Sequence, residues 1–229
     1  MSKKVIFFDI DGTMLSTGGA GQKAMELALI EDFAIDFPFE GVLTAGRTDA
    51  GIEDEIFARY GLNDTRSERD RFRRSYLDRL PDCLRELQGA LLPGVRELLE
   101  QLVADNQFHL SLLTGNYVEG AQVKLRHFQL HEFFRGCGGF GDYHPQRNDV
   151  ARVALDSVRM HLSHNVPGEH TCVIGDTPAD IKCARAINAS VIAVATGVYS
   201  AEQLQPHSPD HLFPDLHSTE TVLDALRNF

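Results

Sequence analysis

Two carboxylates that lie two residues apart, Asp9 and Asp11, follow a short apolar segment near the start of the chain. A simple Asp-Gly turn explains such a pair, and short motifs of this kind often occur without a function. Chemically, however, two close carboxylates need a cation or a shared proton between them. A carboxylate can also attack phosphorus and form an aspartyl phosphate. The pair therefore indicates either a plain turn or the centre of a phosphoryl-transfer site.

A third acid, Asp176, follows another apolar segment and stands just before Thr177 and Pro178. Asp180 has a full structural explanation, because Thr177 and Asp180 fit a capping box and Pro178 fits the first helical position. Asp176 has no such explanation, and a carboxylate at the exit of a buried strand is a ligand that Mg²⁺ prefers. We expect Asp176 to bind metal, while Asp180 either only caps its helix or also supports the metal site.

Two further segments carry groups that bind phosphate. Thr114, Gly115 and Asn116 follow an apolar segment and start a helix, where a hydroxyl and free backbone amides can hold phosphate oxygens; a routine turn is the alternative. Arg147 stands just before a helix that Asn148 is expected to cap. It is the candidate for the cation that offsets the acids and a bound phosphate, and a solvated surface arginine is the alternative.

The candidate residues follow segments that resemble strands buried on both faces. These segments are residues 4–8, 109–114, 171–175 and 190–195, with 137–140 as a weaker fifth. Apolar stripes at helical spacing lie between them. Strands that alternate with helices predict an α/β fold with a doubly wound parallel sheet. With the strand order 3-2-1-4-5, Asp9 lies between Thr114 and Asp176 at the point where the order reverses.

One connection in this scheme is far too long. A crossover between parallel strands needs a dozen residues or slightly more, and many more than that separate Asp11 from Thr114. Because the excess has helical patterning, we predict a helical cap domain at residues 16–89, inserted into a core made of residues 1–15 and 90–229. Within this cap, Arg47 directly precedes a helix that Thr48 could cap. Contact of Arg47 with an anionic group of the substrate is one hypothesis, and a solvent-facing loop arginine is the other.

Composition excludes several classes of protein. The formal net charge is −11, from 22 Lys and Arg against 33 Asp and Glu, which argues against an extended nucleic-acid surface. No apolar run approaches the ~18 residues of a membrane span, and Asp9 comes too early for a signal peptide. We therefore predict a cytoplasmic protein, a monomer or small homo-oligomer, with a small phosphorylated metabolite as its partner and neither nucleic acid nor membrane.

Cysteine and histidine spacing gives no zinc motif. The four cysteines include no CxxC pair, so we interpret them as reduced and mostly buried thiols. His161 and His164 have helical spacing, but no cysteine or acid completes the pair at the usual zinc distance along the chain. We interpret these histidines as structural or solvated.

The combination of motifs resembles the haloacid dehalogenase-like hydrolase superfamily. The residues that carry the resemblance are Asp9-x-Asp11-Gly12-Thr13, Thr114, Arg147 and Gly175-Asp176-x-x-x-Asp180. With a helical cap after the first motif, the chain is similar to the phosphoglycolate phosphatase and β-phosphoglucomutase group, with a Rossmann-like core. The third motif of this family more often has lysine, and Arg147 is the best match here, with Arg152 as the alternative.

The resemblance implies a role for each site residue. Asp9 would be the nucleophile and Asp11 the general acid and base, while Thr114, Gly115, Asn116 and Arg147 would hold the phosphoryl group. Mg²⁺ would be bound by the carboxylates of Asp9 and Asp176 and the backbone carbonyl of Asp11.

The expected activity is that of a Mg²⁺-dependent phosphatase. It would hydrolyse a small phosphomonoester, of the phosphoglycolate or sugar-phosphate type, through an aspartyl phosphate. A hexose-phosphate mutase is the alternative enzyme. A phospho-accepting receiver-type domain fits less well, because it needs neither Asp11 nor the long insertion, and a dehalogenase needs no general acid at position 11.

Overall fold

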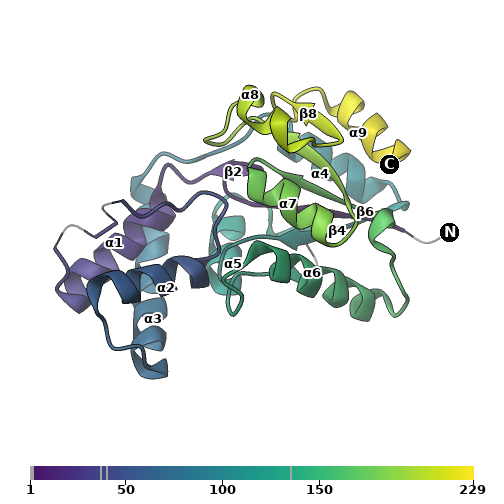
Figure 1. Ribbon diagram of the computed structural model, residues 1–229. Helices are drawn as coiled ribbons and strands as arrows, with labels where there is room; N and C mark the ends of the chain where they lie inside the picture. The colour runs from purple at the N-terminus through teal and green to yellow at the C-terminus, as the bar shows by residue number, and fades with distance from the viewer. Residues whose placement is uncertain (1–2, 37, 40, 135) are drawn as a thin grey trace.

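The computed structural model describes residues 3–36, 38–39, 41–134 and 136–229, and a parallel sheet forms its centre (Figure 1). Across this sheet the strand order is β5-β4-β1-β6-β7-β8, and every pairing is parallel. The strands are β1 (Lys4–Phe8), β4 (Phe108–Leu113), β5 (Gly138–Gly139), β6 (Thr171–Gly175), β7 (Ser190–Val194) and β8 (His211–Phe213). The predicted doubly wound sheet and its order 3-2-1-4-5 are confirmed. The edge strand β8 was not predicted, because it is short and half exposed.

Helices cover both faces of the sheet because its strands are apolar on both sides. On β1, Ile6 and Phe8 join one hydrophobic cluster while Val5 and Phe7 join another, and all four are fully buried. Burial of each such side chain is worth about 1.5–3 kcal/mol, so the central strand is held from both faces. The first cluster includes α4 (Val95–Ala104), α5 (Val118–His127) and α9 (Thr219–Asn228). The second includes α6 (Arg147–Leu162), α7 (Pro178–Ala186) and α8 (Ala201–Leu204).

Three helices lie between the first strand and the rest of the core: α1 (Ala20–Phe33), α2 (Asp49–Tyr60) and α3 (Arg66–Glu86). They stand at one end of the sheet (Figure 1) and enclose a hydrophobic cluster of their own. The rings of Phe33, Phe57 and Phe72 meet edge to face there, with centroids 6.1–6.3 Å apart. The predicted inserted helical cap is therefore present in the fold.

The chain enters and leaves this cap through a short antiparallel pair, β2 (Leu15–Ser16) and β3 (Ala90–Leu91). The division at residues 16 and 89 stays a prediction. Single turns of 3₁₀ helix occur at η1 (His131–Phe133), η2 (Gly168–His170) and η3 (Gln205–His207). Among the described residues, no helix has both the length and the apolar character that crossing a membrane requires.

Candidate active site

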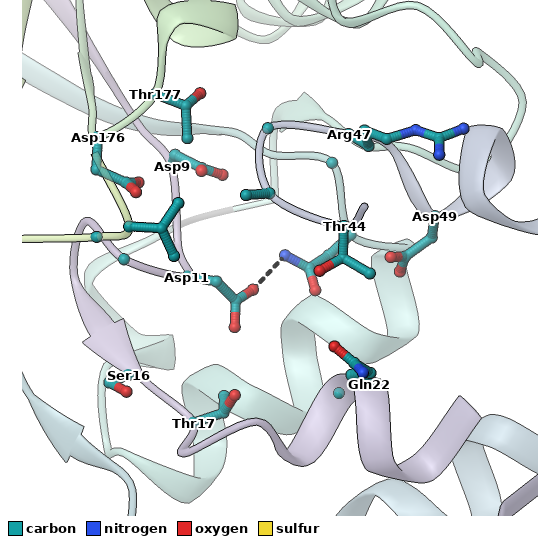
Figure 2. A pocket seen from close by; sticks show the side chains of 18 of the residues that line it. Asp9, Asp11, Ser16, Thr17, Gln22, Thr44, Arg47, Asp49, Asp176 and Thr177 are labelled. Carbon is teal, nitrogen blue, oxygen red and sulfur yellow. Dashed lines mark hydrogen bonds between the residues drawn. The ribbon is translucent and has the colours of Figure 1, made fainter. Parts of the chain in front are cut away.

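A cavity of about 470 Å³ lies where the carboxyl ends of β1 and β6 meet the cap (Figure 2). The strand register explains why the motifs converge there: Phe8 pairs with Leu112 on one side and with Ile174 on the other. Residues that follow these three positions must therefore share one edge of the sheet. Of the predicted site residues, those that line the cavity are Asp9, Asp11, Arg47, Gly115, Asn116, Arg147 and Asp176.

Three buried carboxylates crowd together at the inner end of this cavity. One oxygen from each of Asp9, Asp176 and Asp180 lies within 4.8 Å of the other two. Burial, together with the neighbouring Asp180 and Asp9, raises the pKa of Asp176 to about 8. Burial also raises the pKa of Asp9 to about 6, although Arg147 opposes this shift. Three carboxylates therefore share one buried arginine, Arg147, and burial favours a proton or a cation among them.

Asp180 forms the predicted capping box at the start of α7. One carboxylate oxygen accepts hydrogen bonds from the backbone amide of Thr177 (3.0 Å) and from its hydroxyl (2.7 Å). The other oxygen pairs with the guanidinium of Arg147. Because both oxygens have partners and the side chain is fully buried, Asp180 holds Arg147 in place as well as capping its helix.

Arg147 lies beside Asp9, whereas Arg152 does not reach the site. Nη2 of Arg147 is 3.6 Å from Oδ1 of Asp9, and the side chain is buried. Arg152, more than one turn further along α6, is exposed and pairs with Asp149. The expectation that Asn148 caps this helix is wrong, because α6 begins at Arg147 itself.

Asp11 is held by two groups, one of which the sequence analysis missed. Its Oδ2 accepts hydrogen bonds from Nζ of Lys124 (2.6 Å) and from Nδ2 of Asn116 (2.9 Å; Figure 2). Nζ of Lys124 also donates to Oδ1 of Asn116 (2.6 Å). Lys124 sits on the buried face of α5 beside Ala121 and Leu125. A lysine inside an apolar stripe is unusual, and that position could have marked it as functional.

The residues after Asp11 fit closely around Asp176. The hydroxyl of Thr13 donates a hydrogen bond to Oδ1 of Asp176 (2.8 Å). Gly12 has a φ of +81°, and a Cβ at this position would overlap the Asp176 carboxylate. The Asp-Gly-Thr sequence therefore provides a sharp turn, room for Asp176 and a hydroxyl that orients it.

A sequence profile of haloacid dehalogenase-like hydrolases matches residues 6–194, most of the chain and all of these motifs. The chain belongs to this family. Its relatives include a 5′-nucleotidase of Pseudomonas aeruginosa, 26% identical over 96% of this chain and 95% of the relative. A phosphoglycolate phosphatase of Pseudomonas syringae is 25% identical over 93% of this chain and 77% of the relative. The predicted enzyme class, a phosphatase of this family, is confirmed.

Solved structures of the family share the fold. CbbY from Rhodobacter sphaeroides, in complex with phosphate, superimposes with a TM-score of 0.72 at 18% identity, over 94% of this chain and 96% of that one. A predicted phosphoglycolate phosphatase from Haemophilus somnus gives a TM-score of 0.70 at 19% identity, over 97% and 99% of the two chains. At these identities the likeness concerns the fold alone.

Two predicted contacts of this hydrolase look different in three dimensions. Thr114 is fully buried and lies outside the cavity lining, and its hydroxyl accepts a hydrogen bond from Nδ2 of Asn116 (2.8 Å). The Arg47 side chain points away from the acids (Figure 2), pairs with Glu55 and donates to the carbonyl of Gly51 (2.6 Å). The substrate contact predicted for Arg47 stays a prediction, and this orientation does not support it.

The cap of this hydrolase is closed on the core. The backbone amide of Asp49, at the start of α2, donates to the carbonyl of Gly115 (2.7 Å), and that of Ala50 donates to Gly141 (3.0 Å). The Asp49 carboxylate accepts a hydrogen bond from the backbone amide of Tyr117 (2.7 Å). Burial raises the pKa of Asp49 to about 7, although Lys124 opposes the shift. The cap therefore covers part of the cavity, while the Asp11 side chain stays 39% exposed.

Proposed function

We propose that the protein is a Mg²⁺-dependent phosphatase that hydrolyses a small phosphomonoester through a phosphorylated Asp9. The observation that carries this proposal is that two pairs of charged side chains, Asp9 with Asp176 and Asp11 with Lys124, line the same cavity. Asp9 and Asp176 form a buried pair of oxygen donors beside Arg147, and Asp11 stands next to them, held by Lys124. Charge neutralisation and positioning are what phosphoryl transfer requires.

The acids fit a magnesium ion by their chemistry. Mg²⁺ takes hard oxygen ligands, and the buried oxygens of Asp9 and Asp176 lie close together while Asp180 is already occupied by Thr177 and Arg147. Asp9 and Asp176 would hold the ion, together with the backbone carbonyl of Asp11 that the family resemblance implies. When bound, Mg²⁺ would neutralise negative charge on the phosphoryl oxygens.

The residues of the chain then divide two chemical steps between them. In the first, a carboxylate oxygen of Asp9 attacks phosphorus, the ester P–O bond breaks, and Asp11 donates a proton to the leaving oxygen. In the second, Asp11 takes a proton from water, the water oxygen attacks phosphorus, and the bond to Asp9 breaks. Arg147 and the backbone amides of Gly115 and Asn116 would hold the phosphoryl group during both steps.

The closed cap favours a small substrate. Gln22, Met25 and Tyr76 of the cap line the cavity opposite the acids, and its volume of about 470 Å³ suits a metabolite and not a macromolecule. Relatives named phosphoglycolate phosphatase, 5′-nucleotidase and pyrophosphatase support a small phosphorylated compound. We propose phosphoglycolate or a sugar phosphate as the substrate class.

Phosphate release tests this function. The purified protein is incubated with Mg²⁺ and a panel of phosphoglycolate, sugar phosphates, nucleoside monophosphates and pyrophosphate. We expect turnover of at least one of the first two groups, and loss of that turnover in Asp9→Asn. Asp78→Asn is the matched control, because Asp78 is an exposed carboxylate on α3.

The same reactions separate the phosphatase from a mutase. Release of one inorganic phosphate per substrate consumed supports hydrolysis. Conversion of a hexose phosphate to its isomer without release would instead show that the phosphoryl group returns to the substrate. No turnover of any phosphoester, or full activity in Asp9→Asn, would overturn the proposal.

A further inference from the structure

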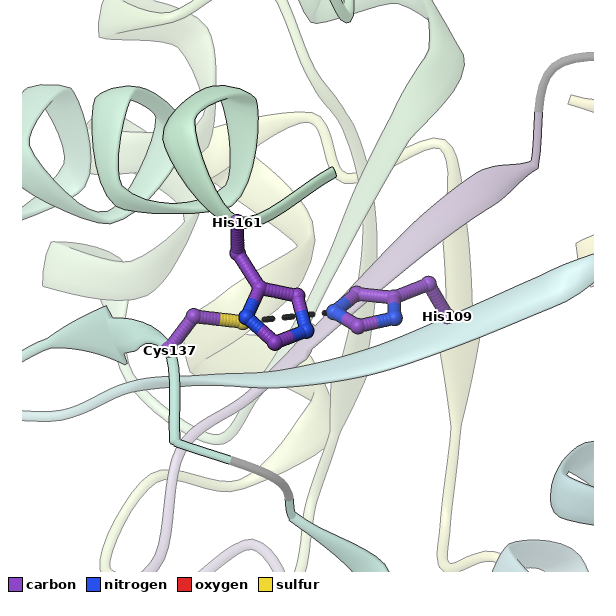
Figure 3. A group of neighbouring side chains, drawn as sticks. All are labelled: His109, Cys137 and His161. Atoms are coloured by element: carbon purple, nitrogen blue, oxygen red, sulfur yellow. Dashed lines mark hydrogen bonds between the residues drawn. The ribbon is translucent and has the colours of Figure 1, made fainter. Parts of the chain in front are cut away.

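A second group of possible metal ligands lies away from the active site, on three elements that are distant in sequence (Figure 3). His109 lies on β4, Cys137 directly precedes β5, and His161 stands in the last turn of α6. On β4, His109 and Ser111 face α6, the same side of the sheet as Leu113. The fold therefore assembles two imidazoles and one thiol that sequence spacing gave no reason to combine.

The distances among these ligand atoms are compatible with a metal site. Nε2 of His109 is 3.2 Å from Sγ of Cys137, and one donor atom from each of the three residues lies within 4.8 Å of the others. Zinc bonds of about 2.1 Å to nitrogen and 2.3 Å to sulfur place two such ligands about 3.5 Å apart in a tetrahedral site. His109 and Cys137 already meet that distance, and the exposed ring of His161 can approach by rotation about its side-chain bonds.

The protonation of the group suits a metal ion. Burial lowers the pKa of His109 to about 4, helped by the nearby His161 and Lys3, so its ring is neutral and keeps a free lone pair. Burial raises the pKa of the Cys137 thiol, which the Ser111 hydroxyl opposes. The bare thiol is therefore protonated at neutral pH, and a metal ion would replace that proton by a bond to sulfur.

We propose that His109, Cys137 and His161 bind one Zn²⁺ ion. Two imidazole nitrogens and one thiolate suit a borderline-soft metal and not Mg²⁺, which prefers oxygen. His161 is exposed, so the fourth position of a tetrahedral ion faces water. This site is independent of the proposed phosphatase, since it shares none of its ligands with the cavity.

Cobalt replaces zinc as a visible probe. The full-length protein, reduced with a phosphine and kept in excess Mg²⁺ to occupy the oxygen site, is titrated with Co²⁺. We expect one equivalent of Co²⁺ to produce a thiolate-to-cobalt charge-transfer band, and Zn²⁺ to abolish that band by displacement. Cobalt bound to carboxylates alone gives no such band, so the active-site acids cannot produce this result.

Variants assign the ligands. Cys137→Ser should lose the band, while the control Cys83→Ser, which changes a buried thiol in the cap, should keep it. His161→Ala should weaken Co²⁺ binding about tenfold or more, and His164→Ala, three residues further along, should not. Because His161 and His164 are both exposed, this pair tests the proposal even if Cys137→Ser folds poorly.

The proposal has clear contrary outcomes. Absence of a thiolate band at one equivalent of Co²⁺ would overturn it, as would a band that persists in Cys137→Ser. Equal Co²⁺ affinity in His161→Ala and His164→Ala would also overturn the three-ligand site. None of these readings depends on turnover, so failure of the phosphatase proposal would leave this test intact.

Discussion

Helix α6 links two regions of opposite chemical character. Its first residue, Arg147, lies beside Asp9 in the active site, and its last turn carries His161. With a rise of about 1.5 Å per residue, these two positions are roughly 20 Å apart. At one end buried carboxylates offer hard oxygen donors, and at the other two imidazoles and a thiol offer nitrogen and sulfur.

The two regions differ in their need for a cation. Burial raises the pKa values of Asp9 and Asp176 even with Arg147 close by, and repulsion from neighbouring carboxylates adds to both shifts. His109 and Cys137 are neutral at pH 7 without metal and satisfy each other by a hydrogen bond. One region therefore depends on a cation for its charge balance, whereas the other only offers ligands to one.

Asp176→Asn should reduce activity more than any of the variants that follow, and it should affect the active site without affecting the group of His109, Cys137 and His161. An amide lacks the charge that binds Mg²⁺, so we expect phosphate release to fall about a thousandfold, equivalent to several kcal/mol of lost metal catalysis. The cobalt-thiolate band of the other region should be unchanged. Asp224→Asn, at an exposed carboxylate on α9, is the control for turnover. A matching loss in both variants would contradict a specific role for Asp176.

Arg147→Met should destabilise the fold. It leaves the buried Asp180 carboxylate without its partner and removes the charge beside Asp9, at a cost of about 3 kcal/mol. Urea unfolding followed by circular dichroism measures the free energy of unfolding. Arg152→Met on the same helix is the control, because its exposed ion pair with Asp149 is worth at most about 1 kcal/mol. Equal losses in the two variants would show that Arg147 is not an internal counter-ion.

Lys124→Met should reduce kcat about tenfold to a hundredfold while KM changes less. Its ammonium orients the Asp11 carboxylate, which we propose as the group that transfers the proton. Steady-state kinetics on the best substrate of the panel checks this expectation. Lys182→Met, at an exposed lysine of α7, should behave like the unmodified protein. An unchanged kcat in Lys124→Met would show that Lys124 does not assist proton transfer by Asp11.

Asp49→Asn should change how stability depends on pH. The pKa of Asp49 in the folded protein, about 7, is above the ordinary value of 3.8, so the fold favours the protonated acid. Its contribution is therefore full at acid pH and is lost as the pH rises from about 4 to about 7. Relative to Asp49→Asn, the unmodified protein should lose at least about 1 kcal/mol across that range, measured by urea unfolding. A pH-independent difference would contradict this account of the contact between cap and core.

His161→Ala should have the smallest effect on the metal-free protein. An exposed side chain at a helix end contributes within about 0.5 kcal/mol to the free energy of unfolding. With Zn²⁺ present, the unmodified protein should gain thermal stability, because the ion binds the folded state, and the variant should gain less. An equal gain in thermal stability in the two proteins would show that His161 does not bind the zinc ion.

Much of the site could be predicted because backbone geometry alone carries it. Asp9 and Asp176 follow buried apolar strands, and neighbouring parallel strands end at one edge of the sheet, so their meeting needs no knowledge of side-chain packing. The capping box of Asp180 is local in the same way. Arg47 and Thr114 were harder, because the direction of each side chain depends on hydrogen bonds to neighbours whose positions packing decides.

By itself, the sequence determined the order of the strands, the inserted helices and the acids at the strand ends, since periodicity and short-range chemistry encode all three. Only the tertiary structure decided that Lys124 reaches Asp11, and that His109 and Cys137 join His161. The interpretation of His161 as structural or solvated stays a prediction, although the fold places His109 and Cys137 close to it. Ligands contributed by a strand, a loop and a helix end have no fixed separation along the chain, and only the packing of α6 on the sheet brings them together.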